Sequence, residues 1–379
     1  MSSSSVIAQP ASDPSTSTAS AASLSTVPPP SETLLALEHA LPSLGASKAA
    51  EDELRNLAAY RAPSCPVAFP TSRLAAVLVL LHLTPAGELG VTLTTRSMRL
   101  RSHPGETALP GGRWEEGDEG VEGTALREAN EEIALPLPPP PASSSSPSHL
   151  LHLTTLAAYT SRTLLVVIPC VYLLLHPASS AESYLAEVLK KNDDEVDAIF
   201  HARLGGFLGL PAERNAANAG GDVRDPPLLT DDPAPAPAPS SLIPPSSSAR
   251  RSTRSQTRSS APLAPSSSPV PEPYTYGHRD FTWLLSRPYR LHSFASASFP
   301  SAVTGLTADI CIDVACIAAY GAEGEEEGQA GFARRADGQM SWAEITAEAL
   351  RMPRDVHKGL SSQGAGGGRA GGDQRTSAT

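Results

Sequence analysis

Residues 111–135 read GGRWEEGDEGVEGTALREANEEIAL, and the acidic residues near the end of this stretch are the most informative feature of the chain. Glu128, Glu131 and Glu132 stand at positions i, i+3 and i+4, which places three carboxylates on one face of a helix. No basic residue is interleaved to pair with them. Because like charges this close repel one another, a bound divalent cation would explain their presence. The alternative is a solvated acidic helix face.

A turn lies directly upstream of this predicted helix. Residues 109–112 (LPGG) can direct backbone groups toward the same cation. Together the two features resemble the Nudix box, whose common form is Gly, five residues, Glu, seven residues, Arg-Glu-apolar-any-Glu-Glu-any-Gly-apolar. The matching residues of the helix are Arg127, Glu128, Ala129, Glu131, Glu132 and Leu135.

The chain departs from the box at two places. Five residues separate Gly112 from Asp118, but the residue separated from Arg127 by seven others is Glu119, so the loop holds one residue more than the common form. The branch of the family that cleaves coenzyme A is similar in this respect. Either Asp118 or Glu119 would anchor the loop. Ala134 replaces the usual glycine, and we expect the helix to run one residue further before Pro136 ends it.

A second motif precedes the box. Residues 92–112 (TLTTRSMRLRSHPGETALPGG) resemble the motif found ahead of the box in coenzyme A pyrophosphatases. Its arginines concentrate positive charge beside an acidic metal site, and coenzyme A carries a diphosphate and a separate 3′-phosphate. The alternative is a solvated basic strand edge. The residues predicted to bind substrate are Arg96, Ser97, Arg99, Arg101, Gly111 and Gly112.

Composition divides the chain into ordered and disordered parts. Its 379 residues include 37 Pro and 28 Gly but only 5% aromatic residues, and several segments lack the apolar surface that folding requires. We predict disorder in 1–30, in the loop 136–148 directly after the acidic helix, in the Pro/Ser-rich insertion 211–272 and in the Gly-rich tail 360–379. The Nudix domain would comprise 31–210, with a helical lead-in, and a closing part at 273–359.

Apolar patterns in the ordered parts predict an α/β protein. Two short helices split at Pro42 are expected within 32–61, and strands at 74–83 and 88–95. The later elements expected are apolar runs at 151–159 and 163–175, a strand edge within 193–208, and a strand, a Gly-Leu-Thr-Ala turn (305–308) and a closing helix within 289–321. The resemblance implies the Nudix α/β/α sandwich with a mixed sheet.

Charge and cysteine content restrict the partners. The formal net charge of −11 argues against nucleic acid as the main partner. The basic stretch 249–258 would be either a docking or import segment or a solvated linker. The four cysteines show no metal-binding spacing and are predicted to be small buried hydrophobes in a reducing compartment. No membrane span is expected, and no targeting signal is apparent. An intracellular location is expected, cytoplasmic or, by family analogy alone, peroxisomal, although the chain ends in Thr-Ser-Ala-Thr.

The family resemblance also implies an activity. Mg²⁺ or Mn²⁺ would be held by Glu128 and Glu132, with Glu131 as a further ligand or as a partner through water. Arg127 would hold these carboxylates by hydrogen bonds, and the Gly112 carbonyl would be an extra ligand. Arg127 and the three glutamates form the predicted catalytic set. The diphosphate of coenzyme A would be hydrolysed to 4′-phosphopantetheine and adenosine 3′,5′-bisphosphate.

Two other functions use the same residues or the same fold. One is hydrolysis of oxidised nucleoside triphosphates such as 8-oxo-dGTP, which would need the same carboxylates. The other is a Nudix fold kept as a binding scaffold, with protein partners recruited through the insertion at 211–272. The upstream arginines favour coenzyme A over the first alternative, and the intact set of glutamates speaks against the second.

Overall fold

The computed structural model describes residues 18–19, 29–63, 69–137, 149–209, 274–325 and 330–352. Three of the segments predicted to be disordered, 1–30, 211–272 and 360–379, lie outside the described residues except for 18–19, 29 and 30. Most of the fourth, the loop 136–148, and the basic stretch 249–258 also lie outside them.

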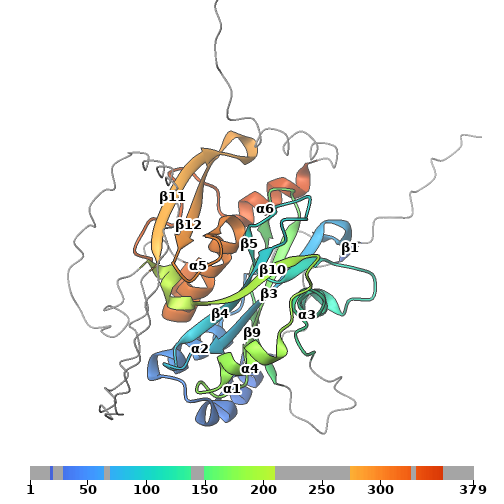
Figure 1. The fold of residues 1–379 in the computed structure, drawn as a ribbon. Helices are drawn as coiled ribbons and strands as arrows, with labels where there is room; N and C mark the ends of the chain where they lie inside the picture. Colours follow the sequence, from blue (N-terminus) through green and yellow to red (C-terminus); the bar gives the residue numbers. More distant parts are fainter. Residues whose placement is uncertain are drawn as a thin grey trace, which may run out of the picture. The chain divides into compact units, whose positions relative to one another are not determined.

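A mixed sheet forms the centre of the described fold (Figure 1), as predicted. Its main strands follow the order β10-β4-β3-β9-β7, and β3 pairs with β9 in parallel while the other pairs are antiparallel. The main strands are β3 (Leu74–Leu83), β4 (Leu89–Arg96), β7 (Leu150–Thr155), β9 (Val166–Leu174) and β10 (Val196–Arg203). Short strands extend it: β5 (Thr107–Ala108) beside β4, β6 (Gly111–Arg113) beside β3 and β8 (Tyr159–Thr160) beside β9.

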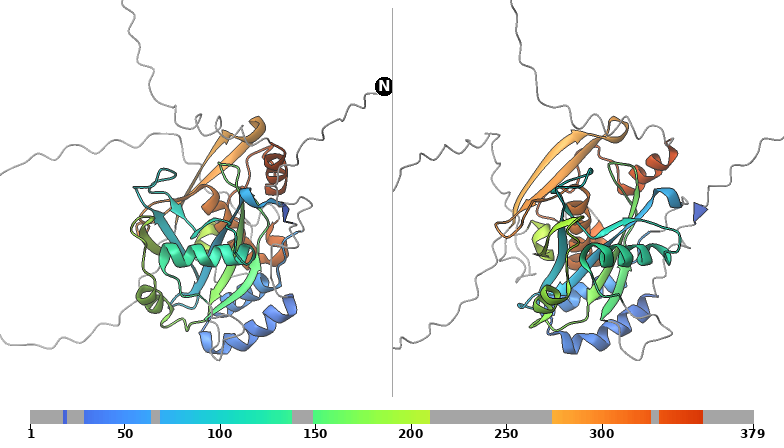
Figure 2. Two further views of the ribbon diagram at one scale, coloured as in Figure 1. Left: turned by 90° about the vertical axis from the view of Figure 1, so that its right-hand side faces the viewer. Right: turned by 45° about the vertical axis from the view of Figure 1, so that its right-hand side comes forward.

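Helices cover both faces of this sheet (Figures 1 and 2), because alternate residues of a strand point to opposite sides. Val79 and Leu81 of β3 show the alternation: Val79, Leu81 and Leu83 share a core with α1 (Pro30–Leu44), α2 (Lys48–Ala59) and α5 (Gly305–Tyr320). Leu78 and Leu80 face a second core with α3 (Gly120–Ile133) and α4 (Ala181–Val188). This is the predicted α/β/α arrangement.

The two predicted leading helices are present, but their division at Pro42 is wrong. Pro42 lies in the last turn of α1, and the helix ends at Gly45, whose φ of 68° reverses the chain direction. A proline this near the C-terminal end removes only one helical hydrogen bond, so the glycine decides the boundary. Ser47 then caps α2 by accepting a hydrogen bond from the Ala50 amide.

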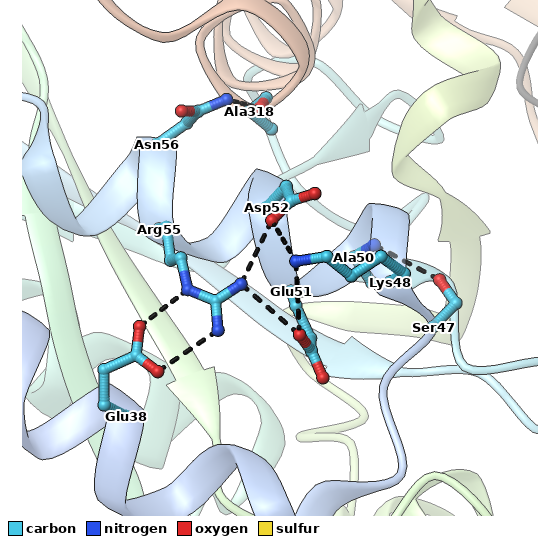
Figure 3. Close-up of polar contacts among 9 residues, drawn as sticks. All are labelled: Glu38, Ser47, Lys48, Ala50, Glu51, Asp52, Arg55, Asn56 and Ala318. Carbon is cyan, nitrogen blue, oxygen red and sulfur yellow. Dashed lines mark hydrogen bonds and ion pairs between the residues drawn. The ribbon is translucent and has the colours of Figure 1, made fainter. Parts of the chain in front are cut away.

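An ion pair joins α1 to α2, and a hydrogen bond joins α2 to α5 (Figure 3). Arg55 donates from Nε and Nη2 to the two carboxylate oxygens of Glu38, at 2.6 and 3.1 Å, and also contacts Asp52. The amide of Asn56 donates to the Ala318 carbonyl of α5 at 2.8 Å. The leading helices are therefore fastened to a helix more than two hundred residues further along the chain.

Residues 274–352 add a C-terminal lobe to the sheet. A three-stranded sheet contains β11 (Thr275–Thr282), β12 (Pro288–Ala295) and β13 (Val303–Thr304), and α6 (Trp342–Arg351) follows α5. Arg73 docks α6 by donating to the carbonyls of Ala349 and Met352 at 2.8 and 2.9 Å. The predicted turn at 305–308 is wrong: Gly305 turns the chain with a φ of 59°, and these residues already form the first turn of α5.

Two further predictions concern buried apolar residues. Among the described residues, Gly305–Gly324 is the one helical stretch long and apolar enough to cross a membrane, with a mean hydropathy of 1.4, yet 56% of it is buried within the fold. It is a core helix here. Cys170, Cys311 and Cys316 are free and buried, as predicted, while Cys65 lies outside the described residues.

Candidate active site

The acidic helix α3 is positioned by its apolar face. Val121, Ala125, Ala129 and Ile133 recur every four residues and pack against the sheet. The glycine pair itself begins β6 (Gly111–Arg113), which pairs with β3 and lies next to the same helix. This geometry brings the glutamates of α3 to Gly111 and Gly112, as the sequence predicts. The predicted turn at 109–112 is wrong for the two glycines, which lie in the strand β6 because they pair with β3.

Glu132 is the most enclosed carboxylate of the set, with 7% of its surface exposed. Its Oε2 accepts a hydrogen bond from the Gly111 amide at 3.2 Å. Burial raises the pKa of Glu132 to about 7, the Gly111 amide and the charge of Arg96 oppose that rise, and Glu128 adds to it. A raised pKa in a buried carboxyl indicates that the surrounding protein groups do not compensate its negative charge.

Glu128 lies against the second glycine. A Cβ atom added to Gly112 would stand 2.4 Å from Glu128 Oε1, so only glycine leaves room for this carboxylate. Burial raises the pKa of Glu128, while the neighbouring Arg127 opposes the rise and Glu131 contributes to it. Glu131 is more open, since 54% of its side chain is exposed.

Arg127 connects the loop to the carboxylates. It donates from Nε and Nη2 to the two oxygens of Asp118, at 2.8 and 3.1 Å, and from Nη2 to the Arg113 carbonyl. Its Nη1 reaches Glu128 Oε1 at 3.1 Å and Glu131 Oε2 at 3.3 Å. Glu128 and Glu131 are therefore paired with Arg127, the residue that precedes them in the sequence, although no basic residue lies between the glutamates.

The same contacts distinguish the two candidates for the loop position. Asp118 accepts the hydrogen bonds of Arg127, whereas Glu119 is exposed and precedes α3 without a side-chain capping bond. The acidic anchor of the loop is Asp118. The expected extension of the helix is wrong, because α3 ends at Ile133 and Ala134 adopts the left-handed conformation, with φ 53°, that glycine usually supplies.

Of the three arginines in the upstream motif, Arg96 acts on the glutamates, whereas Arg99 and Arg101 are exposed. Arg96 ends β4, its charge acts on Glu132 and on Glu106, and its Nε is buried without a hydrogen-bond partner among the described residues. Arg99 is exposed and pairs with Asp194 at 3.3 Å. Arg101 is exposed on the same loop.

Ser97 has a local structural role in the protein. Its side chain is fully buried, its amide donates to the Glu195 carbonyl at 2.8 Å, and its Oγ accepts from the Arg99 amide at 3.3 Å. It shapes the loop that carries the exposed arginines. The predicted role of Ser97 in substrate binding stays a prediction.

Glu195 was missed as a site residue in the sequence. Its exposed carboxylate precedes β10, and its charge contributes to the raised pKa values of both Glu128 and Glu132. The turn before it is tied to α3, since the Asn192 amide donates to the Glu132 carbonyl at 2.8 Å. The acidic run at 193–197 (DDEVD) was the available signal.

The donor set suits a hard divalent cation. Carboxylate oxygens are the ligands that Mg²⁺ and Mn²⁺ prefer. Here the buried Glu132 and the half-buried Glu128, both with raised pKa values, lie beside Gly111 and Gly112 of β6. Within the part of the chain that the structure describes, no three acidic, His or Cys side chains converge closely enough to hold an ion as they stand. Arg127 contacts Glu128 and Glu131 through the same nitrogen, so it holds two of the three glutamates in place.

Comparison with known proteins agrees with this geometry. Residues 72–202 match the NUDIX domain family, and this span includes the main sheet and α3. Residues 72–202 thus form a Nudix domain, and the family and fold predicted from the box are confirmed.

The chain is similar in sequence to three Nudix relatives. The chain is 39% identical over 134 residues to the mitochondrial Nudix hydrolase 15 of Arabidopsis thaliana, covering 35% of this chain and 41% of the relative. It is 38% identical over 126 residues to peroxisomal coenzyme A diphosphatase 1 of Saccharomyces cerevisiae, covering 32% and 37%. It is 35% identical over 135 residues to the peroxisomal coenzyme A diphosphatase ndx-8 of Caenorhabditis elegans, covering 35% and 50%. The matches thus span half or less of each relative.

Proposed function

We propose that this protein is a metal-dependent Nudix hydrolase that cleaves the diphosphate bond of coenzyme A and its derivatives. The products would be 4′-phosphopantetheine and adenosine 3′,5′-bisphosphate. The observation that carries the proposal is the pair of enclosed carboxylates, Glu128 and Glu132, held beside Gly111-Gly112 and acted on by the charge of Arg96. Two relatives whose names state coenzyme A diphosphatase activity support the choice of substrate.

Each residue of the site has a proposed part in the reaction. Bound Mg²⁺ or Mn²⁺ would neutralise the diphosphate and lower the pKa of the attacking water. Glu128, Glu132 and Glu131 would hold it, with the Gly112 carbonyl as an additional ligand. Arg127, anchored by Asp118, orients Glu128 and Glu131.

Two charged groups face the same carboxylates from other elements. Arg96 places positive charge where the substrate phosphates would lie. Glu195 is an exposed carboxylate whose charge acts on Glu128 and Glu132, and it is the candidate to accept the proton of the attacking water.

Substitution of the glutamates tests the proposal. Glu128→Gln and Glu132→Gln keep the side-chain size but remove the charge, and each is expected to lower kcat by about 10²-fold or more, the scale of losing a transition-state electrostatic partner. Glu187→Gln, on the exposed surface of α4, is the matched control and retains wild-type turnover. Wild-type turnover in both active-site variants would remove the assignment.

The substrate is tested by identifying products. Coenzyme A and 8-oxo-dGTP are incubated side by side with the protein and Mg²⁺ or Mn²⁺, and products are measured by mass spectrometry. Phosphopantetheine forming ahead of nucleoside monophosphate supports the proposal, and Arg96→Ala should then reduce coenzyme A cleavage far more than nucleotide cleavage. The reverse order would favour the nucleotide hydrolase, and no product from either would favour the scaffold.

The location and partners are also proposals. The two coenzyme A diphosphatase relatives are peroxisomal by name, which supports a peroxisomal location alongside the cytoplasmic alternative. Protein partners recruited through 211–272 remain a prediction, because that segment lies outside the described residues.

A further inference from the structure

Thr107 of β5, a short strand that lies in sequence between Arg96 and Gly111, is hydrogen-bonded to the C-terminal lobe. Thr107 Oγ1 donates to the Ser301 carbonyl at 3.2 Å and shares a 2.8 Å hydrogen bond with Ser301 Oγ. Thr307, in the first turn of α5, donates from Oγ1 to the Thr107 carbonyl at 3.2 Å. Thr107 is buried, with 5% of its surface exposed. Both its side chain and its backbone are therefore held by residues that lie outside the Nudix domain at 72–202.

The segment that carries Ser301 is itself anchored. Phe299 packs against Phe200 of β10 and against Tyr274, with ring centroids 5.3 and 4.9 Å apart. Two residues after Ser301, β13 begins and pairs with β12. The hydroxyl of Ser301 is thus presented to Thr107 from a fixed position.

Strand β5 joins the two halves of the site. On its N-terminal side, the Glu106 carbonyl accepts from the Arg96 amide at 2.9 Å, which places Arg96. On its C-terminal side, the Pro110 carbonyl accepts from the Leu78 amide at 2.8 Å, and the next amide, that of Gly111, donates to Glu132. A displacement of β5 would shift both Arg96 and the glycine pair, Gly111 and Gly112, relative to the glutamates.

We infer that Ser301 and Thr307 are positioning residues, through which the C-terminal lobe fixes β5 and thereby aligns Gly111 with Glu132 and Arg96 with the site. The inference rests on the proposed function and assigns to that site two residues beyond the Nudix domain. They act through Thr107 and contact neither the glutamates nor Arg96 by any hydrogen bond in the described part of the chain.

The test compares two threonines, Thr307 and Thr346, whose hydroxyls each make a hydrogen bond between the C-terminal lobe and the Nudix domain. Thr307→Val removes the hydroxyl that holds β5 and keeps the side-chain shape. Thr346→Val is the matched control, because Thr346 Oγ1 makes a buried 2.9 Å hydrogen bond with Thr160 Oγ1, which also joins the C-terminal lobe to the Nudix domain but through β8 and not through β5. Thr307→Ser keeps the hydroxyl and serves as the rescue, and Ser301→Ala is the second test variant.

Kinetics and hydrogen exchange are both measured on the full chain. Thr307→Val and Ser301→Ala are expected to lower kcat by about 10-fold, the lower end of the effect of removing a residue that orients a catalytic group, with KM changed by less than about three-fold. The amides of Leu78 and Gly111 exchange faster in these two variants. Thr346→Val lowers the melting temperature to a similar degree but leaves kcat and both amides unchanged, and Thr307→Ser behaves as wild type.

Two results would overturn the inference. One is an unchanged exchange rate at Leu78 and Gly111 in both Thr307→Val and Ser301→Ala. The other is an equal loss of kcat in Thr346→Val, which would show a general loss of stability. If the wild-type protein hydrolyses neither substrate, the proposed function fails, while the exchange measurement still decides whether the two residues hold β5.

Discussion

Arg127 and Asp118 form a two-point ion pair, with Nε to Oδ1 at 2.8 Å and Nη2 to Oδ2 at 3.1 Å, that fixes the loop against the acidic helix. Asp118 also accepts hydrogen bonds from the Glu115 amide and the Thr124 hydroxyl. Burial alone would raise the pKa of Asp118, but the hydrogen bonds of Arg127, Glu115 and Thr124 lower it below its ordinary value. The ionised Asp118 holds Arg127 where its remaining nitrogen reaches Glu128 and Glu131.

Asp118→Asn is expected to lower kcat by about 10- to 100-fold, as loss of the partner that orients a metal-binding residue commonly does. The amide presents at most one acceptor oxygen to a guanidinium that now contacts two. Steady-state kinetics with coenzyme A measure the effect. Glu119→Gln is the control, since Glu119 is exposed and makes no capping bond, and it keeps the wild-type rate. A larger loss in Glu119→Gln than in Asp118→Asn would contradict the assignment of the anchor.

The sequence predicted the parts of the site that depend on local spacing. Glu128 and Glu132 lie on one helical face because four residues make about one helical turn, whatever surrounds the helix. The choice between Asp118 and Glu119 depends on where the loop ends and α3 begins, which spacing alone leaves open. Glu195 directly precedes the strand β10, and only the pairing of β10 within the sheet places its charge near Glu132 of α3.

The strands, too, divide into those that local sequence patterns predict and those that they do not. The strands β3 and β4 were predicted because β3 is almost entirely apolar and β4 begins with apolar residues at alternate positions, Leu89, Val91 and Leu93. The strand β11 was not predicted, because six of its eight residues are exposed and its sequence TYGHRDFT has no apolar alternation. The role of Thr107 was also invisible, since its partners Ser301 and Thr307 follow almost two hundred residues later.

Metal addition should stabilise the folded protein. A ligand that binds only the folded state at 100 times its dissociation constant adds about 2.7 kcal/mol to the free energy of unfolding. Thermal unfolding with and without Mg²⁺ or Mn²⁺ is therefore expected to show a higher melting temperature with metal in the wild type. The double variant Glu128→Gln, Glu132→Gln should show no rise, and a chelator should reverse it in the wild type. An equal rise in both proteins would place metal binding elsewhere.

Ala134 offers a stabilising substitution. Its φ of 53° is left-handed, a conformation that an L side chain disfavours and glycine adopts readily. Ala134→Gly is expected to raise the free energy of unfolding by about 0.5–1 kcal/mol, measured by urea denaturation. Ala129→Gly, in the interior of the same helix, is the opposite control and is expected to lower it by roughly 1 kcal/mol. Destabilisation by Ala134→Gly would show that the helix end is held by other contacts.

His82 gives the protein a pH dependence that can be isolated. Its ring in β3 is fully buried, neither ring nitrogen has a hydrogen-bond partner among the described residues, and the ring of His201 lies 4.7 Å away. Burial lowers the pKa of His82 to about 3, and His201 adds to the effect. Gly90 is required opposite it, because a Cβ there would lie 2.6 Å from His82 Nε2.

The sign of the pH effect follows from the two states of the protein. Between about pH 6.5 and the folded value of about 3, the unfolded chain binds a proton at His82 that the folded protein excludes, so stability falls as the pH falls. At pH 5 this amounts to about 2 kcal/mol relative to pH 7.5.

His82→Leu removes this contribution together with two unsatisfied polar atoms, so the variant should be more stable than the wild type. Between pH 7 and pH 5 its free energy of unfolding should fall by less than that of the wild type, with a difference on the order of 2 kcal/mol. Urea denaturation at each pH measures both quantities. His278→Leu, at an exposed position on β11, is the matched control and should follow the wild-type pH dependence. An unchanged pH dependence in His82→Leu would mean that His82 is protonated in the folded protein, which the closed packing against Gly90 and His201 opposes.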